Sequence, residues 1–221
     1  MPTINVNRQG HIQGITSGNF NTARTSESGL LSVTDGITGQ KPVQYFHSVR
    51  GKRFNRAFLH FDTSGITGTL SAAHIDVNGG STSDPDPNDT IMVKSTAFGG
   101  DGGTALAASD FFSSIDYSTA YSTELTSWSA SNNEYTLTAA ALADIKNNDH
   151  FTLAIVEHDS DYTNSDQTEV SDIVVDFGVT ITLDYTLAPT GYANTVNGVA
   201  AANIGKVMGV ATASISKVNG I

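Results

Sequence analysis

The side chains best suited to chemistry gather in one acidic segment, Glu157–Asp166, which contains four acids and a histidine. Carboxylate oxygens at such spacing are the ligands that Ca²⁺ prefers. The segment lacks the glycine and the closing glutamate of an EF-hand loop, and it contains no His-Glu-x-x-His motif for zinc. A solvated acidic loop is therefore the simpler interpretation. Calcium is the alternative cofactor, and its candidate ligands are Glu157, Asp159, Asp161 and Asp166.

A second charged segment carries four cations in the seven positions from Arg50 to Arg56. It allows two interpretations: a contact for an anion or a partner protein, or a solvated hairpin loop whose cations offset the surrounding acids. We favour the solvated loop, because basic side chains are mostly exposed. The candidate partner-contact residues are Arg50, Lys52, Arg53 and Arg56.

The composition excludes several functional classes. The 221-residue chain carries 11 Lys and Arg against 22 Asp and Glu, a net charge of −11. Nucleic acids and anionic membranes require a basic footprint, so neither partner is expected. The chain has no cysteine, which excludes thiol catalysis, disulfides and thiolate metal sites. No nucleophile with a placed base and no cofactor loop can be identified, so we expect a protein that is not an enzyme and requires no cofactor.

The elements that must position these groups are β-strands. Side chains alternate from Arg56 to Asp62, which places Leu59 and Phe61 on one face of an extended segment while Phe58 joins the other. The pattern predicts strands that turn one face toward a core. The predicted core residues are Leu59, Phe61, Ile75, Val77, Leu153, Ile155 and Ile181.

Helices are expected to be few and short. Thr138–Lys146 has an N-cap threonine followed by three alanines, which favours a helix. Ala105–Phe112 is a second candidate, with Leu106 and Phe111 facing inward. Because long helical periodicity is absent, we expect an all-β fold. The prediction is an antiparallel jelly-roll β-sandwich over residues 1–186, with one or two short helices and an extended C-terminal arm over residues 187–221.

A family resemblance supports this expectation. The motif Phe58-Leu-His-Phe-Asp-Thr-Ser64 is followed by Ser71-Ala-Ala-His-Ile75, and the segments Asn133–Thr138 and His150–Val156 continue the pattern. This series resembles the DNRLRE-type β-sandwich, a jelly roll found in carbohydrate-binding and cell-surface modules. The resemblance implies a sandwich fold and raises glycan binding as a function. No glycan or calcium ligand of that family can be placed on this sequence.

The C-terminal segment repeats itself every 11 residues. Val196, Val207 and Val218 keep one phase, and Gly198, Gly209 and Gly220 keep another. An internal repeat of this kind is a stronger signal than an isolated motif, and the glycines favour turns over a continuous helix. The segment resembles the tails of structural proteins from marine tailed bacteriophages. Its apolar residues, which we expect to bind another subunit, are Val196, Val199, Ile204, Val207, Val210, Ile215, Val218 and Ile221.

Together these features predict a structural protein of a bacteriophage virion, made in the host cytoplasm. The expected role is a capsid decoration or cement protein, or a fibre-like subunit. Its expected partners are other copies of itself, as a homotrimer, and the major capsid protein or other virion proteins. The alternative is a carbohydrate-binding module that attaches to a host-surface glycan. An exposed aromatic platform would favour the glycan binder, and a large subunit interface would favour the cement protein.

Overall fold

A computed structural model of the chain describes residues 1–80, 89–168, 171–188, 206–207 and 210–211. The chain divides into two compact units, Met1–Thr186 and Leu187–Ile221. The second unit contains one described hairpin, in which β13 (Lys206–Val207) pairs with β14 (Val210–Ala211). Of the predicted assembly residues, Val207 and Val210 lie in this hairpin, and the following lie outside the described part of the chain: Val196, Val199, Ile204, Ile215, Val218 and Ile221.

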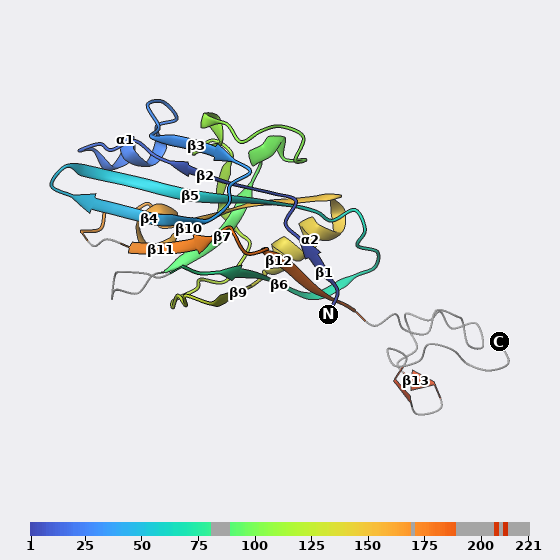
Figure 1. Ribbon diagram of the computed structural model, residues 1–221. Helices are drawn as coiled ribbons and strands as arrows, with labels where there is room; N and C mark the ends of the chain where they lie inside the picture. Colours follow the sequence, from blue (N-terminus) through green and yellow to red (C-terminus); the bar gives the residue numbers. More distant parts are fainter. Residues whose placement is uncertain (81–88, 169–170, 189–205, 208–209, 212–221) are drawn as a thin grey trace. The chain divides into compact units, whose positions relative to one another are not determined.

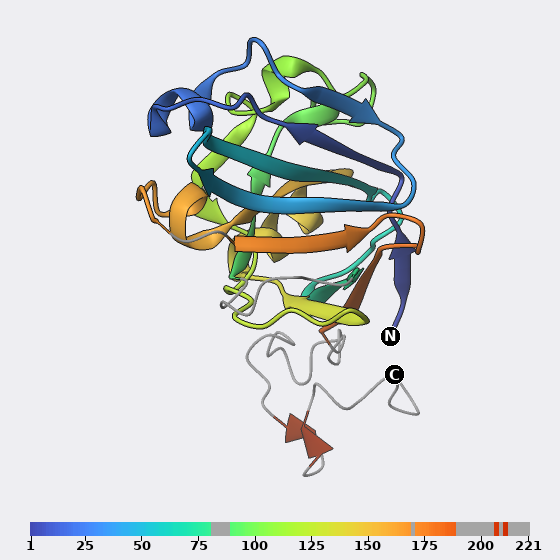
Figure 2. The same ribbon diagram turned by 60° about the vertical axis from the view of Figure 1, so that its left-hand side comes forward.

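Two sheets build the first unit, and every strand pairing given for the described residues is antiparallel (Figures 1 and 2). The smaller sheet has the strand order β1-β12-β6-β9. Its strands are β1 (Thr3–Asn5), β12 (Thr182–Leu187), β6 (Leu70–Asn78) and β9 (Asn132–Thr136).

The larger sheet is organised around its longest strand, β5 (Gly51–Asp62), which pairs with three others. The remaining strands are β2 (Arg8–Gln13), β3 (Ser32–Asp35), β4 (Gln40–Ser48), β7 (Thr90–Ser95), β8 (Ile115–Ala120), β10 (His150–Glu157) and β11 (Ser171–Asp176). Both views show β4, β5 and β11 side by side in this layer, with β6 and β9 in the other (Figures 1 and 2). The all-β sandwich predicted from sequence is confirmed.

Short helices fill the connections. The predicted helix after Thr138 is confirmed as α2 (Ala139–Asn147), and the Thr138 hydroxyl accepts the N–H of Ala141. The helix expected over residues 105–112 is only a 3₁₀ turn, Ala108–Asp110, although Leu106 and Phe111 are both buried as predicted. The other helical elements are α1 (Phe20–Thr25), a 3₁₀ turn (Ala97–Gly99) and a π-helical turn (His158–Tyr162).

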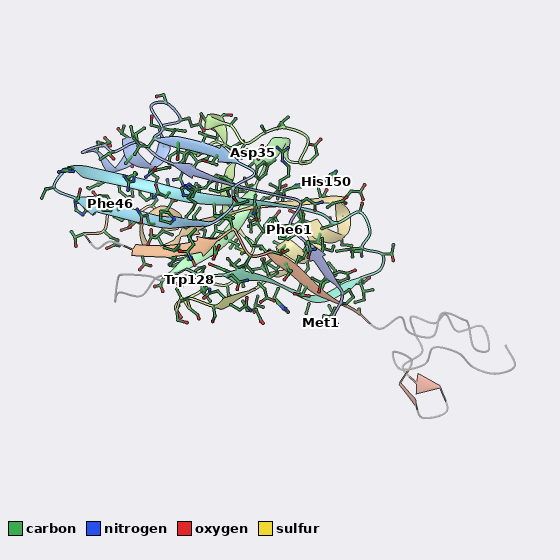
Figure 3. All side chains as sticks on the ribbon, viewed as in Figure 1. Met1, Asp35, Phe46, Phe61, Trp128 and His150 are labelled. Atoms are coloured by element: carbon green, nitrogen blue, oxygen red, sulfur yellow. The ribbon has the colours of Figure 1, made fainter. Side chains whose placement is uncertain are left out.

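The main hydrophobic core lies between the two sheets. All seven predicted core residues belong to this cluster, and each is 0% exposed. They come from both layers: Phe61 and Leu153 from the larger sheet, Ile75 and Val77 from the smaller one. Phe61 is labelled in Figure 3. The side-chain alternation in the sequence therefore identified the inner faces of both layers correctly.

A second hydrophobic cluster covers the opposite face of the larger sheet. It contains Phe54 and Phe58 of β5, together with Ala154 and Val156 of β10. Helix α1 and the segment between β7 and β8 supply its outer members, including Phe98 and Phe111. The expectation of a single buried face is therefore wrong for β5, because segments from elsewhere in the chain cover its second face. Strand β10, whose sequence is almost continuously apolar, is likewise buried on both faces.

Candidate functional site

The two charged segments singled out in the sequence meet in the second cluster. Arg56 on β5 forms a two-point ion pair with Asp161 of the π-helical turn, with Nε–Oδ2 at 2.6 Å and Nη2–Oδ1 at 2.7 Å. The two side chains are 0% and 1% exposed. Such paired N–H···O contacts are the strong geometry for a guanidinium and a carboxylate.

The rest of the polar network completes the hydrogen bonding of this pair. Arg24 donates through Nε to Asp161 Oδ1 at 3.2 Å and to the Asp161 carbonyl at 2.9 Å, and Tyr117 donates its hydroxyl to Oδ1 at 2.9 Å. Arg56 also lies over the Phe111 ring, 4.0 Å from its centroid. Burial alone would lower the pKa of Arg56, but the adjacent Asp161 carboxylate raises it above the ordinary value. Arg56 therefore stays protonated, and the pair fastens the π-helical turn to β5.

Glu157 holds the π-helical turn in place. Its Oε1 accepts the Asp159 N–H at 2.8 Å, while Oε2 accepts the N–H groups of Ser160 and Asp161 at 2.8 and 3.0 Å. These are backbone donors that the first turn of a helix leaves without partners. Burial raises the pKa of the Glu157 carboxyl to about 7.

The four acids considered as calcium ligands therefore do not form one site. Asp161 is bound by arginines and Glu157 by backbone N–H groups, whereas Asp166 pairs with Lys52 and accepts the Tyr45 hydroxyl at 2.9 Å. Among the described residues, no three of these four acids bring ligand atoms within 4.8 Å of one another. The interpretation as a solvated loop is also wrong for Glu157 and Asp161, which are 2% and 1% exposed.

The four cations of Arg50–Arg56 likewise lie in different surroundings. Arg50 is exposed in the turn between β4 and β5, and it alone of the four fits the solvated-loop interpretation. Arg53 lies over the Phe46 ring at 5.0 Å, Lys52 pairs with Asp166, and Arg56 is fully buried. The partner-contact candidates therefore do not form one basic surface.

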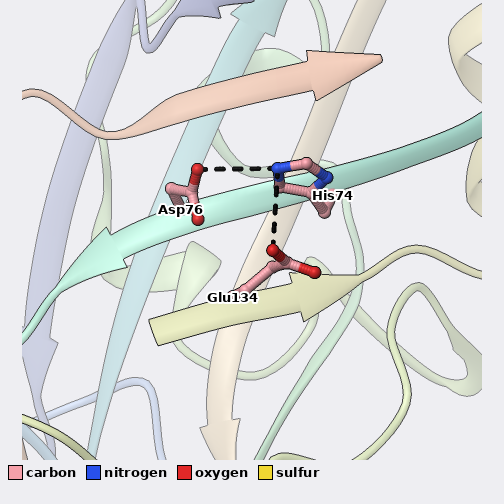
Figure 4. Close-up of side chains that lie close together, drawn as sticks. All are labelled: His74, Asp76 and Glu134. Atoms are coloured by element: carbon pink, nitrogen blue, oxygen red, sulfur yellow. Dashed lines mark ion pairs between the residues drawn. The ribbon is translucent and has the colours of Figure 1, made fainter. Parts of the chain in front are cut away.

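A different cluster, which sequence reasoning missed, lies on the smaller sheet (Figure 4). Nε2 of His74 faces Oδ2 of Asp76 at 3.6 Å and Oε2 of Glu134 at 3.9 Å. Asp184 Oδ2 lies 3.9 Å from the same nitrogen. The spacing of His74 and Asp76 could have signalled that they share a strand face, but Glu134 and Asp184 become neighbours only through the strand order.

A second histidine cluster joins the π-helical turn to the segment after β8. Nδ1 of His158 lies 3.1 Å from Glu124 Oε1 and 2.9 Å from Asp159 Oδ1. These are ordinary hydrogen-bond distances, so one ring proton accounts for the arrangement. The contacts of His74 are all longer than a hydrogen bond, which distinguishes the two clusters.

Comparisons with known proteins give no family assignment. A scan against protein-family models found no match, and a search of curated proteins also returned no match. The resemblances to DNRLRE-type domains and to phage structural proteins therefore rest on the sequence motifs alone. Within the described residues, no helix combines the length and apolar character needed to cross a membrane.

Proposed function

We propose that this protein is a non-enzymatic structural subunit of a virus particle. In this proposal the sandwich is a rigid body, and residues 187–221 join it to an assembly. The proposal rests on the division of the chain after Thr186. Beyond that boundary the sequence changes to an 11-residue repeat that begins at Val196. Members of the two core clusters in the described residues lie between Ile12 and Leu183. In this proposal the valines and isoleucines of the repeat bind another subunit.

The charge distribution also supports assembly through the arm. Residues 187–221 contain Lys206 and Lys217 and no acid, whereas the rest of the chain has 9 Lys and Arg against 22 acids. A weakly basic, apolar segment on an acidic body suits contact with the acidic surface of another copy. We propose a homotrimer as this assembly, displayed as a capsid decoration or cement protein or as a fibre-like subunit, with the major capsid protein or another virion protein as its further partner.

The polar network of the sandwich fits a structural role as well. Arg56 and Glu157 have raised pKa values, and they are bound to Asp161 and to backbone N–H groups. Perturbed ionisable groups often mark active sites, but ion pairs of purely structural use perturb pKa values equally. Here each carboxylate oxygen accepts from a protein donor, so the network has no open position for a substrate.

The glycan-binding alternative finds no support in the described surface. Large hydrophobic side chains that are exposed among the described residues include no aromatic; they are Met1, Leu31, Val33, Val49, Val179 and Leu187. The sole tryptophan, Trp128, is half-buried and packs against the main core. A flat aromatic platform for a sugar ring is the feature that would have favoured this function.

Deletion of residues 187–221 tests the proposal. Sedimentation velocity should show a multimer for the full chain and a monomer for residues 1–186. The near-ultraviolet circular dichroism of the truncated protein should match that of the full chain, because residues 1–186 form a compact unit of their own. If the truncated protein still sediments as the same multimer, residues 187–221 are not the element that holds the assembly together.

A further inference from the structure

We infer that His74, Asp76, Glu134 and Asp184 form a binding site for a divalent transition-metal cation of the zinc type. The site lies entirely on the sandwich, and it does not depend on the proposed assembly function. Three observations carry the inference: the convergence of the ligand atoms of His74, Asp76 and Glu134 with Asp184 beside them, the way two of the acids are held, and the uncompensated charge.

The ligands converge because of sheet register. His74 and Asp76 are two residues apart on β6, so both project from one face while Ile75 between them enters the core. Asp76 is directly opposite Glu134 on β9, whose neighbour Tyr135 is also buried. Asp184 comes from β12, the strand next to β6. Three adjacent strands therefore bring one imidazole and three carboxylates to the same place on the outer face.

The separations fit a shared cation better than direct contact. The three distances from His74 Nε2, 3.6, 3.9 and 3.9 Å, all exceed those of hydrogen bonds. Ligand atoms about 2.0–2.2 Å from a tetrahedral zinc lie about 3.3–3.6 Å from one another. The ligand atoms of His74, Asp76 and Glu134 all lie within 4.8 Å of one another, so these three groups can close around one ion, and Asp184 flanks them from β12. Glu134 is the most exposed of the four, with 58% side-chain exposure, and can make this adjustment.

The aspartates are oriented by neighbours outside the cluster. Asp76 accepts the Asn132 amide through Oδ1 at 2.7 Å, which leaves Oδ2 facing His74. Asp184 accepts the Thr3 hydroxyl through Oδ1 and that of Thr182 through Oδ2 at 3.2 Å. Supporting hydrogen bonds of this kind fix ligand geometry in metal sites and contribute to affinity.

The excess of carboxylates in the cluster also favours a bound cation. Three carboxylates lie around one imidazole nitrogen, and among the described residues no lysine or arginine forms an ion pair with any of them. A divalent ion would offset most of this negative charge. A hollow of about 190 Å³, lined by His74 and Glu134 among others, adjoins the cluster and leaves room for a water ligand. Imidazole nitrogen selects zinc and similar metals over Ca²⁺, which prefers oxygen ligands alone.

Isothermal titration calorimetry of the full chain with Zn²⁺ tests the inference. We expect saturable binding at one ion per chain, and at least tenfold weaker binding of Ca²⁺. His74→Gln and Asp76→Asn should each weaken the Zn²⁺ affinity at least tenfold. Because both residues lie on the outer face, the variants should keep the far-ultraviolet circular dichroism of the parent. Zn²⁺ should also raise the melting temperature of the parent and not that of His74→Gln.

Two histidine variants serve as controls. His47→Gln removes a histidine outside both clusters, and His158→Gln removes the one that already hydrogen-bonds Glu124 and Asp159. Both should bind Zn²⁺ within twofold of the parent. The inference is overturned if no saturable Zn²⁺ binding occurs, if His74→Gln binds as well as the parent, or if His158→Gln is the variant that loses binding.

Discussion

Arg56 and Asp161 are 105 positions apart in the sequence and form a buried two-point ion pair at 2.6 and 2.7 Å. The pair fastens the π-helical turn after β10 to the middle of β5. It also closes the second hydrophobic cluster, because the guanidinium lies against Phe111 and donates through Nη2 to the Arg24 carbonyl at 2.9 Å. The buried Asp161 carboxylate is tolerated in this apolar cluster because both of its oxygens accept hydrogen bonds.

Removing one partner of this pair should be costly. Arg56→Met leaves Asp161 buried with one fewer cation, and loss of one member of a buried pair typically costs about 3–5 kcal/mol. Denaturant unfolding monitored by fluorescence measures this change. Arg50→Met is the matched control from the same cationic segment, and as an exposed substitution it should stay within about 0.5 kcal/mol of the parent. Equal effects of the two substitutions would contradict the structural role of Arg56.

The main core gives a second prediction. Phe61 is 0% exposed between the two sheets and lies near Phe151, with 6.4 Å between ring centroids. Phe61→Ala should lower the free energy of unfolding by about 3–5 kcal/mol, because a buried ring is lost and a cavity remains. Val49→Ala, at a fully exposed position, should change it by less than about 0.5 kcal/mol. A loss below about 1 kcal/mol for Phe61→Ala would mean that Phe61 does not fill the core.

Two buried groups should make stability depend on pH in opposite directions. Burial lowers the pKa of His11 to about 4, so the unfolded chain takes up a proton near pH 6.5 that the folded protein does not. Its stabilising contribution is therefore lost as the pH falls from 6.5 to 4. Burial raises the pKa of Glu157 to about 7, so the folded protein keeps a proton that the unfolded chain releases near pH 4.5. The stabilising contribution of Glu157 to the free energy of unfolding is therefore lost as the pH rises from 4.5 to 7.

Single substitutions separate the two effects, each of which amounts to about 3 kcal/mol across its range. Relative to the parent, His11→Gln should become less stable as the pH rises from 4.5 to 6.5, since the Glu157 effect is then unopposed. Glu157→Gln should show the reverse slope, in addition to a uniform loss because an amide has one acceptor oxygen for three N–H groups. Urea unfolding at a series of pH values measures both slopes. Identical pH profiles for the parent and His11→Gln would refute the assignment to His11.

The sequence predicted the main core because alternation within a strand is a local property. Leu59 and Phe61 alternate with their neighbours whatever the rest of the chain does, and α2 begins at its N-cap for equally local reasons. The second cluster was not predictable in this way, because the segments that cover Phe58 are distant in sequence. The same holds for Arg56 with Asp161 and for His74 with Glu134 and Asp184. In each case strand order and loop packing, not spacing, create the contact.

The two charged segments show why the charge of a segment does not by itself predict whether its side chains are exposed. Glu157–Asp166 and Arg50–Arg56 each look solvated when considered alone, since an unpaired buried charge is costly. Their charges are opposite, however, and Arg56 pairs with Asp161 inside the fold while Lys52 pairs with Asp166. No local pattern could pair these segments, because Arg56 and Asp161 are 105 positions apart.

The most direct test of the proposed function concerns the repeat itself. Sedimentation velocity should be measured for the full chain and for two triple variants. The repeat variant carries Val196→Ser, Val207→Ser and Val218→Ser. The control carries Val33→Ser, Val49→Ser and Val179→Ser, which remove three exposed valines of the sandwich. We expect a trimer for the full chain and the control, and a monomer of about the 23.2 kDa chain mass for the repeat variant. A monomeric full chain, or a repeat variant that still sediments as the same multimer, would contradict it.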